Sequence, residues 1–369
     1  MIRVIGLMSG TSLDGVDAAC LETDGVTIGA TGPAVTVPFS AELRGRMRDI
    51  YGHAAMISPG DPELRAVERE LTLLHVQAVR ALDWPAELIG FHGQTILHRP
   101  EDARTWQIGD AGLLSRELGL PVVHDFRSAD VRAGGEGAPL VPVFHDALAH
   151  DMARPLAVLN IGGVANLSLL GPGGRLVACD VGPGNALLDD WAMRHTGVPY
   201  DRDGALARAG QVSQRVLAAL MSDPFFVRGA PKSLDRMSFH RGMELLSDLS
   251  AEDGAATLAA FTVRAVANTR LPFLPRRWLV CGGGRHNPVL MEGLSHSLTV
   301  PVAPVEAVGW DGDALEAQCF AFLAMRSVRG LALSFPDTTG VAQPVTGGRL
   351  HLDGVAEAAA RVVTAWRPA

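Results

Sequence analysis

Hydrophobic and polar positions alternate in short runs along the chain, and each kind of run predicts one kind of element. Residues 3–7 and 16–21 are strand-like and flank a turn of small residues. Between residues 62 and 82, apolar side chains recur every three or four positions, which predicts an amphipathic helix. The chain is therefore predicted to be mixed α/β. The other predicted strands lie at 88–91, 121–123, 156–160, 165–170, 175–180 and 278–281, and the other helices at 111–118, 186–195, 251–271, 288–298 and 313–326.

The pattern restarts near the middle of the chain. A strand, a turn of small residues and a returning strand open the sequence, and VLNIGG followed by ANLSLL repeats this arrangement from residue 158. A length of 369 residues also exceeds one ordinary domain of roughly 100–200 residues. We therefore expect two related α/β domains facing each other across a cleft, at residues 1–140 and 141–369, with a hinge near 139–143. The C-terminal segment is expected to pack back on the first domain.

Composition narrows the class of protein. Hydrophobic residues make up 47% and charged residues 20%, which supports packed cores. A net charge of −8 provides no basic surface for nucleic acid or anionic lipid. Four widely separated cysteines without a CxxC pair exclude a thiolate zinc cage and a disulfide scaffold, and are typical of a reducing cytosol. We expect a cytoplasmic protein without a signal peptide, because residues 1–7 pass at once into small polar residues. The uncharged stretch 156–174 holds five glycines and so favours strands over a membrane helix.

The first candidate motif is GLMSGTSLDGVD at residues 6–17. Glycines, hydroxyls and consecutive backbone N–H groups are the components of a phosphate-binding turn. Its acidic residues indicate Mg²⁺ or a substrate hydroxyl. A hairpin turn whose hydroxyls cap its own backbone explains the composition equally well. The candidate residues are Gly10, Thr11, Ser12, Leu13, Asp14, Gly15, Val16 and Asp17.

The second motif, DVGPGN, begins at Asp180, after a predicted strand and before a predicted helix. A carboxylate at the end of a strand is well placed to act as a general base. The alternative is an ordinary helix start in which Asn185 caps the helix and Asp180 accepts turn N–H bonds.

The third motif is CGGGRHNP at residues 281–288. The N-terminus of the following helix offers free N–H donors to a nucleotide. Asn287 stands where a dinucleotide-binding motif has its third glycine, which disfavours that class of site. Pro288 at the first helical turn is equally consistent with ordinary helix initiation.

Phosphate recognition in this chain cannot depend on a Walker lysine. The sequence has thirty-one arginines and a single lysine, Lys232, which lies in no glycine-rich loop and is interpreted either as a residue serving the cleft or, preferably, as a surface residue. His92 and Gln94 follow a predicted strand and could hydrogen-bond a sugar. Arg127 could bind a substrate carboxylate, although a salt bridge to Asp130 is a simpler interpretation.

The order of the motifs is more specific than any one of them. GLMSGTSLDGVD, HGQT, QIGD, DFRSADVRAGGEGAPLVP, NIGGVANLS, DVGPGNALLDDW, CGGGRHNP and GDALEAQCFAFLA follow one another from residue 6 to residue 324. Together they closely resemble anhydro-N-acetylmuramic acid kinase. The resemblance implies an actin-like/hexokinase-like fold, in which two RNase H-like domains close around ATP, and a homodimer.

The resemblance also implies a reaction. ATP and water would convert 1,6-anhydro-N-acetylmuramic acid, a sugar from cell-wall recycling, to N-acetylmuramic acid 6-phosphate and ADP. Asp180 matches the family's catalytic aspartate and would activate water. Gly10–Asp17 would form the ATP phosphate loop, with Mg²⁺ bridging the phosphates. The glycines expected near the nucleotide are Gly162, Gly163, Gly182, Gly282, Gly283 and Gly284, and the residues expected to contact the sugar are His92, Gln94, Arg127, Asp130 and Glu316.

Two other functions stay open from the sequence. The first is a kinase for another anhydrosugar, such as levoglucosan, which lacks the lactyl carboxylate that Arg127 would bind. The second is an ATP-gated binding module, because this fold also serves such roles.

Overall fold

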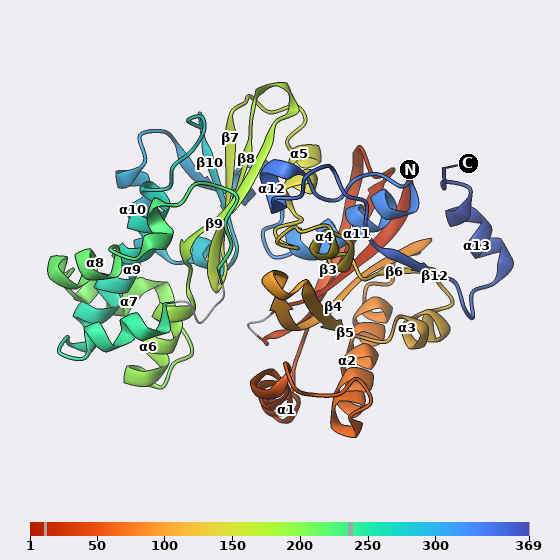
Figure 1. The fold of residues 1–369 in the computed structure, drawn as a ribbon, viewed down its shortest axis with the longest axis horizontal. Helices are drawn as coiled ribbons and strands as arrows, with labels where there is room; N and C mark the ends of the chain where they lie inside the picture. The colour runs from red at the N-terminus through yellow and green to blue at the C-terminus, as the bar shows by residue number, and fades with distance from the viewer. Residues whose placement is uncertain (11–12, 235–238, 369) are drawn as a thin grey trace. The chain divides into compact units, whose positions relative to one another are not determined.

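The computed structural model describes residues 1–10, 13–234 and 239–368, and these form two compact units (Figure 1). The first unit combines Met1–Leu148 with Ala314–Ala369, and the second comprises Ala149–Asp313. The first unit is therefore discontinuous in sequence.

The first unit is built on a seven-stranded sheet with the spatial order β12-β6-β4-β1-β2-β3, to which β5 adds by pairing with β4. Its strands are β1 (Ile2–Ser9), β2 (Gly15–Thr23), β3 (Ile28–Pro38), β4 (Leu88–Arg99), β5 (Arg104–Ile108), β6 (Val122–His124) and β12 (Arg349–His351). Its helices are α1 (Ala41–His53), α2 (Pro62–Ala81), α3 (Ala111–Leu118), α4 (Ser128–Arg132), α5 (Pro142–Leu148), α11 (Leu315–Val328), α12 (Pro336–Thr339) and α13 (Glu357–Thr364).

Helix α11 packs against β1, β2 and β4 at the centre of this sheet. The approach is close: a Cβ added to Gly6 would lie 1.7 Å from the carbonyl oxygen of Ala317, and one added to Gly90 would lie 2.1 Å from that of Phe320. Only glycine fits at these two strand positions. Because α11 follows the second unit in the sequence, the structure differs here from a single division near residue 140.

The second unit contains a five-stranded sheet with the order β11-β10-β7-β8-β9. Helix α9 packs against β9, and Gly182 permits this contact because a Cβ there would lie 2.5 Å from the Cβ of Ala265. The strands are β7 (Leu156–Ile161), β8 (Val164–Leu170), β9 (Leu176–Pro183), β10 (Trp278–Cys281) and β11 (Val302–Pro304). The helices are α6 (Ala186–Thr196), α7 (Ala205–Ala209), α8 (Gln214–Leu220), α9 (Ala251–Ala267) and α10 (Pro288–Ser297).

The two sheets share one topology. In the first unit, β1 pairs antiparallel with β2, β2 pairs antiparallel with β3, and β4 and β6 continue the sheet in parallel from β1. In the second unit, β7, β8 and β9 repeat the antiparallel part, and β10 and β11 repeat the parallel part. The prediction of two related α/β domains with the actin-like/hexokinase-like fold is confirmed.

Some elements differ in length from those predicted. The predicted strand at 88–91 continues as β4 to Arg99, because its polar residues pair with β5. The predicted strand at 175–180 continues as β9 to Pro183, so Asp180 lies within the strand and not at its end. The sequence analysis did not predict β3, β5 or α1.

All four cysteines lie in the described part of the chain, where they are buried and form no disulfide. Burial raises the pKa of the thiols of Cys20 and Cys179 to about 12, so these two side chains are packed as thiols.

Candidate functional site

The first glycine turn joins β1 to β2. Thr11 and Ser12 lie outside the described residues, whereas Gly10 and Leu13 close the turn through a hydrogen bond from the Leu13 N–H to the Gly10 carbonyl oxygen at 3.2 Å. Leu13 has a φ of 60°, which is strained for a residue with a side chain. The conformation is held because the Leu13 side chain is buried and Arg44 Nε donates to its carbonyl oxygen at 3.0 Å. Strain maintained in this way is typical of ligand-binding turns.

The remaining residues of this motif belong to strand β2. Gly15 is required there because a Cβ would lie 2.4 Å from the Val37 carbonyl oxygen. Val16 is buried in the core, and Asp17 Oδ1 accepts a hydrogen bond from Thr36 Oγ1 at 2.6 Å. Asp14 is exposed in the turn itself. The structure thus separates the predicted phosphate loop into a turn ending at Asp14 and a strand that supports it.

Strand β4 carries Gln94 to the same turn. Gln94 is fully buried, and its Nε2 donates to the Gly10 carbonyl oxygen at 3.1 Å and contacts the Tyr51 hydroxyl. Ser9 Oγ donates to the Gly93 carbonyl oxygen at 3.2 Å. The HGQT motif and the glycine turn are therefore one connected structure.

His92 and Arg127 form a buried pair beside this structure. Arg127 Nε donates to His92 Nε2 at 2.9 Å, and His92 Nδ1 lies 2.8 Å from the Gly93 carbonyl oxygen. Because a guanidinium only donates, the imidazole accepts at Nε2 and its proton is at Nδ1. Burial, together with the positive charge of Arg127, holds the pKa of His92 well below its usual range. His92 is therefore a neutral residue that orients Arg127.

Arg127 is bound at two of its nitrogen atoms. In addition to the bond with His92, its Nη1 donates to the Gly137 carbonyl oxygen at 2.7 Å. Burial lowers the pKa of Arg127, and the negative charges of Glu316 and Asp130 oppose that shift. Among residues 1–10, 13–234 and 239–368, no salt bridge joins Arg127 to Asp130, so the simpler interpretation of the sequence analysis is wrong.

Asp130 holds the loop that contains Gly137. Its Oδ1 accepts from the Gly137 N–H and its Oδ2 from Thr339 Oγ1, each at 2.6 Å. The carboxylate is 2% exposed, which indicates a structural role. Glu316, in contrast, is exposed in the first turn of α11.

In the second unit, Asp180 is oriented by a segment that follows it by about fifty residues. Its Oδ2 accepts from the Leu234 N–H at 2.7 Å, and its own N–H donates to the Lys232 carbonyl oxygen at 2.9 Å. The side chain is partly exposed. A carboxylate with one oxygen fixed in this way has the restricted orientation that a general base requires.

Lys232 is buried, so its interpretation as a surface lysine is wrong. It is 3% exposed, its Nζ donates to the Phe225 carbonyl oxygen at 3.1 Å, and the same atom lies 3.9 Å from the centroid of the Phe225 ring. Burial lowers the pKa of Lys232, and nearby Cys179 and Asp180 oppose the shift. A compact ammonium suits a position whose partners are one carbonyl oxygen and an aromatic face.

Two glycine turns leave the second sheet at the same edge. Strands β7 and β10 are parallel and pair Asn160 with Cys281, so the turn at Gly162 and Gly163 lies beside the turn at Gly282–Gly284. Gly282 has a φ of +74°, and a Cβ there would lie 2.2 Å from Asn160 Oδ1. The structure thus brings these five predicted residues together, whereas Gly182 serves the packing of β9 against α9.

Asn185 binds the first of these turns, where its backbone N–H donates to the Gly162 carbonyl oxygen at 2.7 Å. Its Nδ2 donates to the Ile161 carbonyl oxygen at 3.2 Å, and its side chain makes no capping hydrogen bond, so the predicted N-cap role is wrong. Asn287 does cap its helix, accepting from the N–H groups of Val289 and Leu290, with Pro288 at the first position. Pro288 therefore stands in the first turn of α10, as ordinary helix initiation requires.

Arg285 was not among the candidate residues predicted from the sequence. Its side chain is 3% exposed; Nε donates to Glu306 Oε1 at 2.7 Å, Nη1 to the Gly282 carbonyl oxygen at 3.0 Å, and Nη2 lies 2.9 Å from Asp313 Oδ1. Burial opposes the charge, but the hydrogen bonds with Glu306 and Asp313 outweigh burial and raise the pKa of Arg285. Arg285 therefore stabilises the second glycine turn, and no local pattern indicated it because both carboxylates lie far along the chain.

Two kinds of feature are absent from the described part of the chain. No helix there is long and apolar enough to cross a bilayer. Nor does any group of three or more His, Cys, Asp or Glu side chains in those residues have the arrangement of a metal site.

Comparison with known proteins places these residues in a family context. The family profile described as anhydro-N-acetylmuramic acid kinase matches residues 2–352. A relative of that name from Gluconobacter oxydans (strain 621H) is 62% identical over 95% of this chain and 99% of its own length. Another, from Acidiphilium cryptum (strain JF-5), is 56% identical over 96% of this chain and 99% of its own. A solved structure of a ROK family glucokinase from Streptomyces griseus in complex with glucose and AMPPNP is 14% identical, with a TM-score of 0.41 over 88% of this chain and 99% of its own.

Proposed function

The chain belongs to the anhydro-N-acetylmuramic acid kinase family, and we propose that it converts 1,6-anhydro-N-acetylmuramic acid, water and ATP to N-acetylmuramic acid 6-phosphate and ADP. The observation that carries the proposal is the 62% identity to a relative of that name over 95% of this chain. This substrate derives from peptidoglycan turnover, so the protein would act in the cytoplasm in cell-wall recycling and amino-sugar catabolism.

Asp180 is the proposed general base. In an ordinary sugar kinase, a base removes a proton from the attacking hydroxyl, but O6 of the anhydrosugar carries no proton. Asp180 would instead take a proton from water while the water oxygen bonds to C1 and the C1–O6 bond breaks. O6 then bonds to the γ-phosphorus of ATP, and the bond from that phosphorus to the ADP oxygen breaks. The hydrogen bond from the Leu234 N–H supports this role because it orients the carboxylate.

The glycine turns are the proposed nucleotide-binding groups. The turn between β1 and β2 would hold the phosphates of ATP, and Gly162, Gly163 and Gly282–Gly284 offer a surface without side chains to the nucleotide. Mg²⁺ bound to ATP is commonly coordinated by one or two protein carboxylates, by phosphate oxygens and by water. It would neutralise part of the negative charge of the phosphates. The exposed carboxylate of Asp14 fits such a ligand, whereas one oxygen of Asp17 already accepts from Thr36.

The sugar-binding groups are proposed to come from the structure around His92, Gln94, Arg127 and Glu316. The exposed carboxylate of Glu316 suits a sugar hydroxyl, and the guanidinium of Arg127 is preorganised by His92 and Gly137. Asp130 would act indirectly, by holding the loop at Gly137. The family resemblance also supports a homodimer, whose mass in solution is a direct test.

Incubation of the purified protein with ATP, Mg²⁺, ¹⁸O-labelled water and a panel of anhydrosugars tests the proposed function. We expect the N-acetylated anhydrosugar that carries the lactyl group to be phosphorylated with the highest kcat/KM of the panel, with one label at C1 and none in the phosphate. Preferred turnover of levoglucosan would instead establish a kinase for neutral anhydrosugars. Binding of ATP without any turnover would establish a binding module, and label in the phosphate would show simple ATP hydrolysis.

A further inference from the structure

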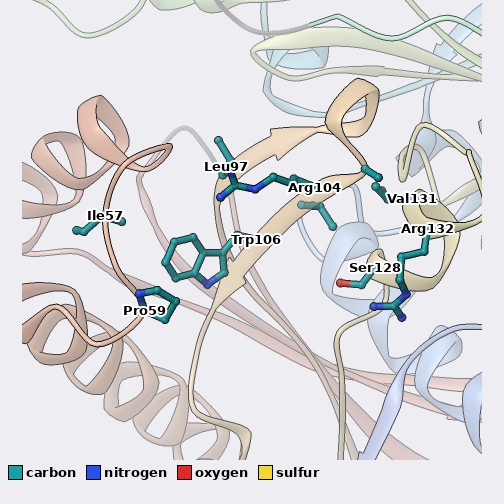
Figure 2. Close-up of a pocket in the computed structure, with 10 residues that line it drawn as sticks. Ile57, Pro59, Leu97, Arg104, Trp106, Ser128, Val131 and Arg132 are labelled. Carbon is teal, nitrogen blue, oxygen red and sulfur yellow. The ribbon is translucent and has the colours of Figure 1, made fainter.

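A cavity of about 330 Å³ lies within the first unit, and the reaction described above assigns it no role. It is lined by the hairpin of β4 and β5, the loop at residues 57–59 and helix α4 (Figure 2). Its volume falls at the lower end of the roughly 300–1,000 Å³ typical of small-molecule sites. The cavity is therefore large enough to hold part of a small ligand.

The lining combines positive charge with an aromatic surface. Arg104 and Arg132 both line the cavity, and within residues 1–10, 13–234 and 239–368 neither forms an ion pair with a carboxylate. No acidic residue is among those that line it. Trp106 is partly exposed, and Figure 2 shows its indole ring on the same side as Ile57 and Pro59. Two uncompensated guanidinium groups in a protein of net charge −8 favour an anionic ligand.

The cavity adjoins the residues proposed to bind the sugar. Ser128 lines it and directly follows Arg127 in the chain. Thr105 also lines it, and its Oγ1 lies 3.0 Å from Nδ1 of His98, whose Nε2 lies 2.9 Å from the Glu136 carbonyl oxygen. The next residue, Gly137, accepts from Arg127. A chain of contacts through His98 and residues 136–137 therefore connects the lining of the cavity with the Arg127 guanidinium.

The two guanidiniums of the cavity are better available to a carboxylate than Arg127 is. Arg127 already donates to His92 and to Gly137, and burial lowers its pKa. In N-acetylmuramic acid the lactyl group is attached at O3, across the ring from the C1–O6 bridge that reacts. Its carboxylate must consequently be bound apart from the reacting atoms.

We propose that Arg104 and Arg132 bind the lactyl carboxylate of the sugar and that Trp106 packs against the apolar part of the same substituent. The inference rests on the proposed function and assigns the preference for an acidic sugar to this cavity. A bidentate guanidinium–carboxylate pair supplies the charge and the direction of the contact, and an indole supplies apolar surface beside it.

The test compares two substrates that differ only in the lactyl group: 1,6-anhydro-N-acetylmuramic acid and 1,6-anhydro-N-acetylglucosamine. Arg104→Gln and Arg132→Gln are each expected to lower kcat/KM for the acidic sugar by roughly tenfold to a hundredfold, the effect of losing a hydrogen bond to a charged group, and to leave the neutral sugar unchanged. Arg104→Lys should recover part of the loss because it restores the charge. Arg69→Gln, which changes an exposed arginine of α2 that does not line the cavity, is the matched control and should change neither substrate.

Calorimetric titration measures the affinity of each variant for the acidic sugar. This second measurement does not depend on turnover of the neutral sugar. Unchanged affinity and unchanged kcat/KM in both glutamine variants would overturn the inference, as would an equal loss with both sugars, which indicates structural damage. If the wild-type protein phosphorylates no anhydrosugar at all, the proposed function fails. If it is active and the variants keep its substrate preference, the inference about the cavity fails alone.

Discussion

At the scale of single residues, two hydrogen bonds connect Asp180 with the backbone of the segment that contains Lys232. The 232–234 segment donates to the Asp180 carboxylate through the Leu234 N–H and accepts from the Asp180 N–H through the Lys232 carbonyl. Lys232 in turn is fixed against Phe225, which anchors the segment. The segment that holds the proposed base is thus anchored by the chain's single lysine.

Asp180→Asn tests the proposed base directly. An amide oxygen can still accept from the Leu234 N–H, so the fold is expected to be retained, but an amide cannot take a proton from water. We expect turnover to fall by about a hundredfold to ten-thousandfold with nearly unchanged ATP affinity, measured by coupled assay and calorimetry. Asp248→Asn, an exposed acidic residue of the same unit, is the control. Turnover near that of the wild type would remove Asp180 from the role of base.

His75 gives a prediction about pH and stability. It is fully buried, its Nε2 has no hydrogen-bond partner among the described residues, and burial lowers its pKa to about 4 from the usual 6.5. As pH falls from 6.5 towards 4, the unfolded chain binds a proton at this position that the folded chain does not, so the folded state loses stability. At about 1.4 kcal/mol per pKa unit, the loss reaches roughly 3 kcal/mol.

His75→Leu should therefore unfold with a weaker pH dependence between pH 6.5 and 4 than the wild type, measured by urea denaturation at a series of pH values. The exposed His53 supplies the control, since His53→Gln should leave the slope unchanged. Parallel curves for wild type and His75→Leu would contradict the prediction. His145, also buried and with a pKa lowered to about 3, leaves part of the acid sensitivity in place.

At the scale of elements, the glycines of the second unit fall into two classes. Gly282 and Gly182 are required by contacts within the protein, at 2.2 Å from Asn160 and 2.5 Å from Ala265 for an added Cβ. Gly163 is not required by any such contact, because the nearest atom to an added Cβ is the Cβ of Ala186 at 3.7 Å. A glycine that packing does not require is available to a ligand that approaches the backbone.

Gly163→Ala and Gly182→Ala are consequently expected to have opposite effects. Gly163→Ala should keep the thermal stability of the wild type and weaken ATP binding by about tenfold, the equivalent of about 1.4 kcal/mol. Gly182→Ala should lower the Tm, because the new methyl group overlaps Ala265 in α9. Thermal unfolding and nucleotide titration of both variants distinguish the effects. Normal ATP affinity in Gly163→Ala would argue against a nucleotide at this turn.

At the scale of the whole molecule, the chain completes the first unit only after it has formed the second. Helix α11 supplies Ala317, Ala321 and Ala324, all fully buried, to the first unit. The second unit has a continuous sequence and its own core, to which Trp191, Phe226 and Phe261 of α9 belong. The two units therefore differ in their ability to fold alone.

A fragment of residues 149–313 is expected to unfold cooperatively in isolation, whereas a fragment of residues 1–148 is expected to remain without a fixed tertiary structure. In the shorter fragment, the sheet surface at Gly6 and Gly90 would be exposed to water, because α11 is missing. Near-ultraviolet circular dichroism measures the tertiary structure of each fragment, and thermal scans measure whether it unfolds cooperatively. Fusion of residues 314–369 to the 1–148 fragment by a flexible linker should restore folding, and a native-like 1–148 fragment would show that α11 is dispensable.

The sequence by itself determined the mixed α/β class, the duplication and the family. Strand periodicity and glycine turns depend on neighbouring residues, so the repeated strand–turn–strand of residues 1–21 and 156–170 was visible without the fold. The order of the eight motifs likewise identified the family without knowledge of the fold. Asp180 could also be proposed as the base from the sequence, because its motif is local.

Only the tertiary structure decided which polar groups meet. The burial of Lys232, the contacts of Arg285 with Glu306 and Asp313, and the return of α11 to the first sheet join residues that lie far apart in the chain. The arginine–tryptophan cavity likewise combines a hairpin, a loop and a helix from separate segments. Such contacts depend on how elements pack, and hydrophobic periodicity identifies the buried face of an element without specifying its partner.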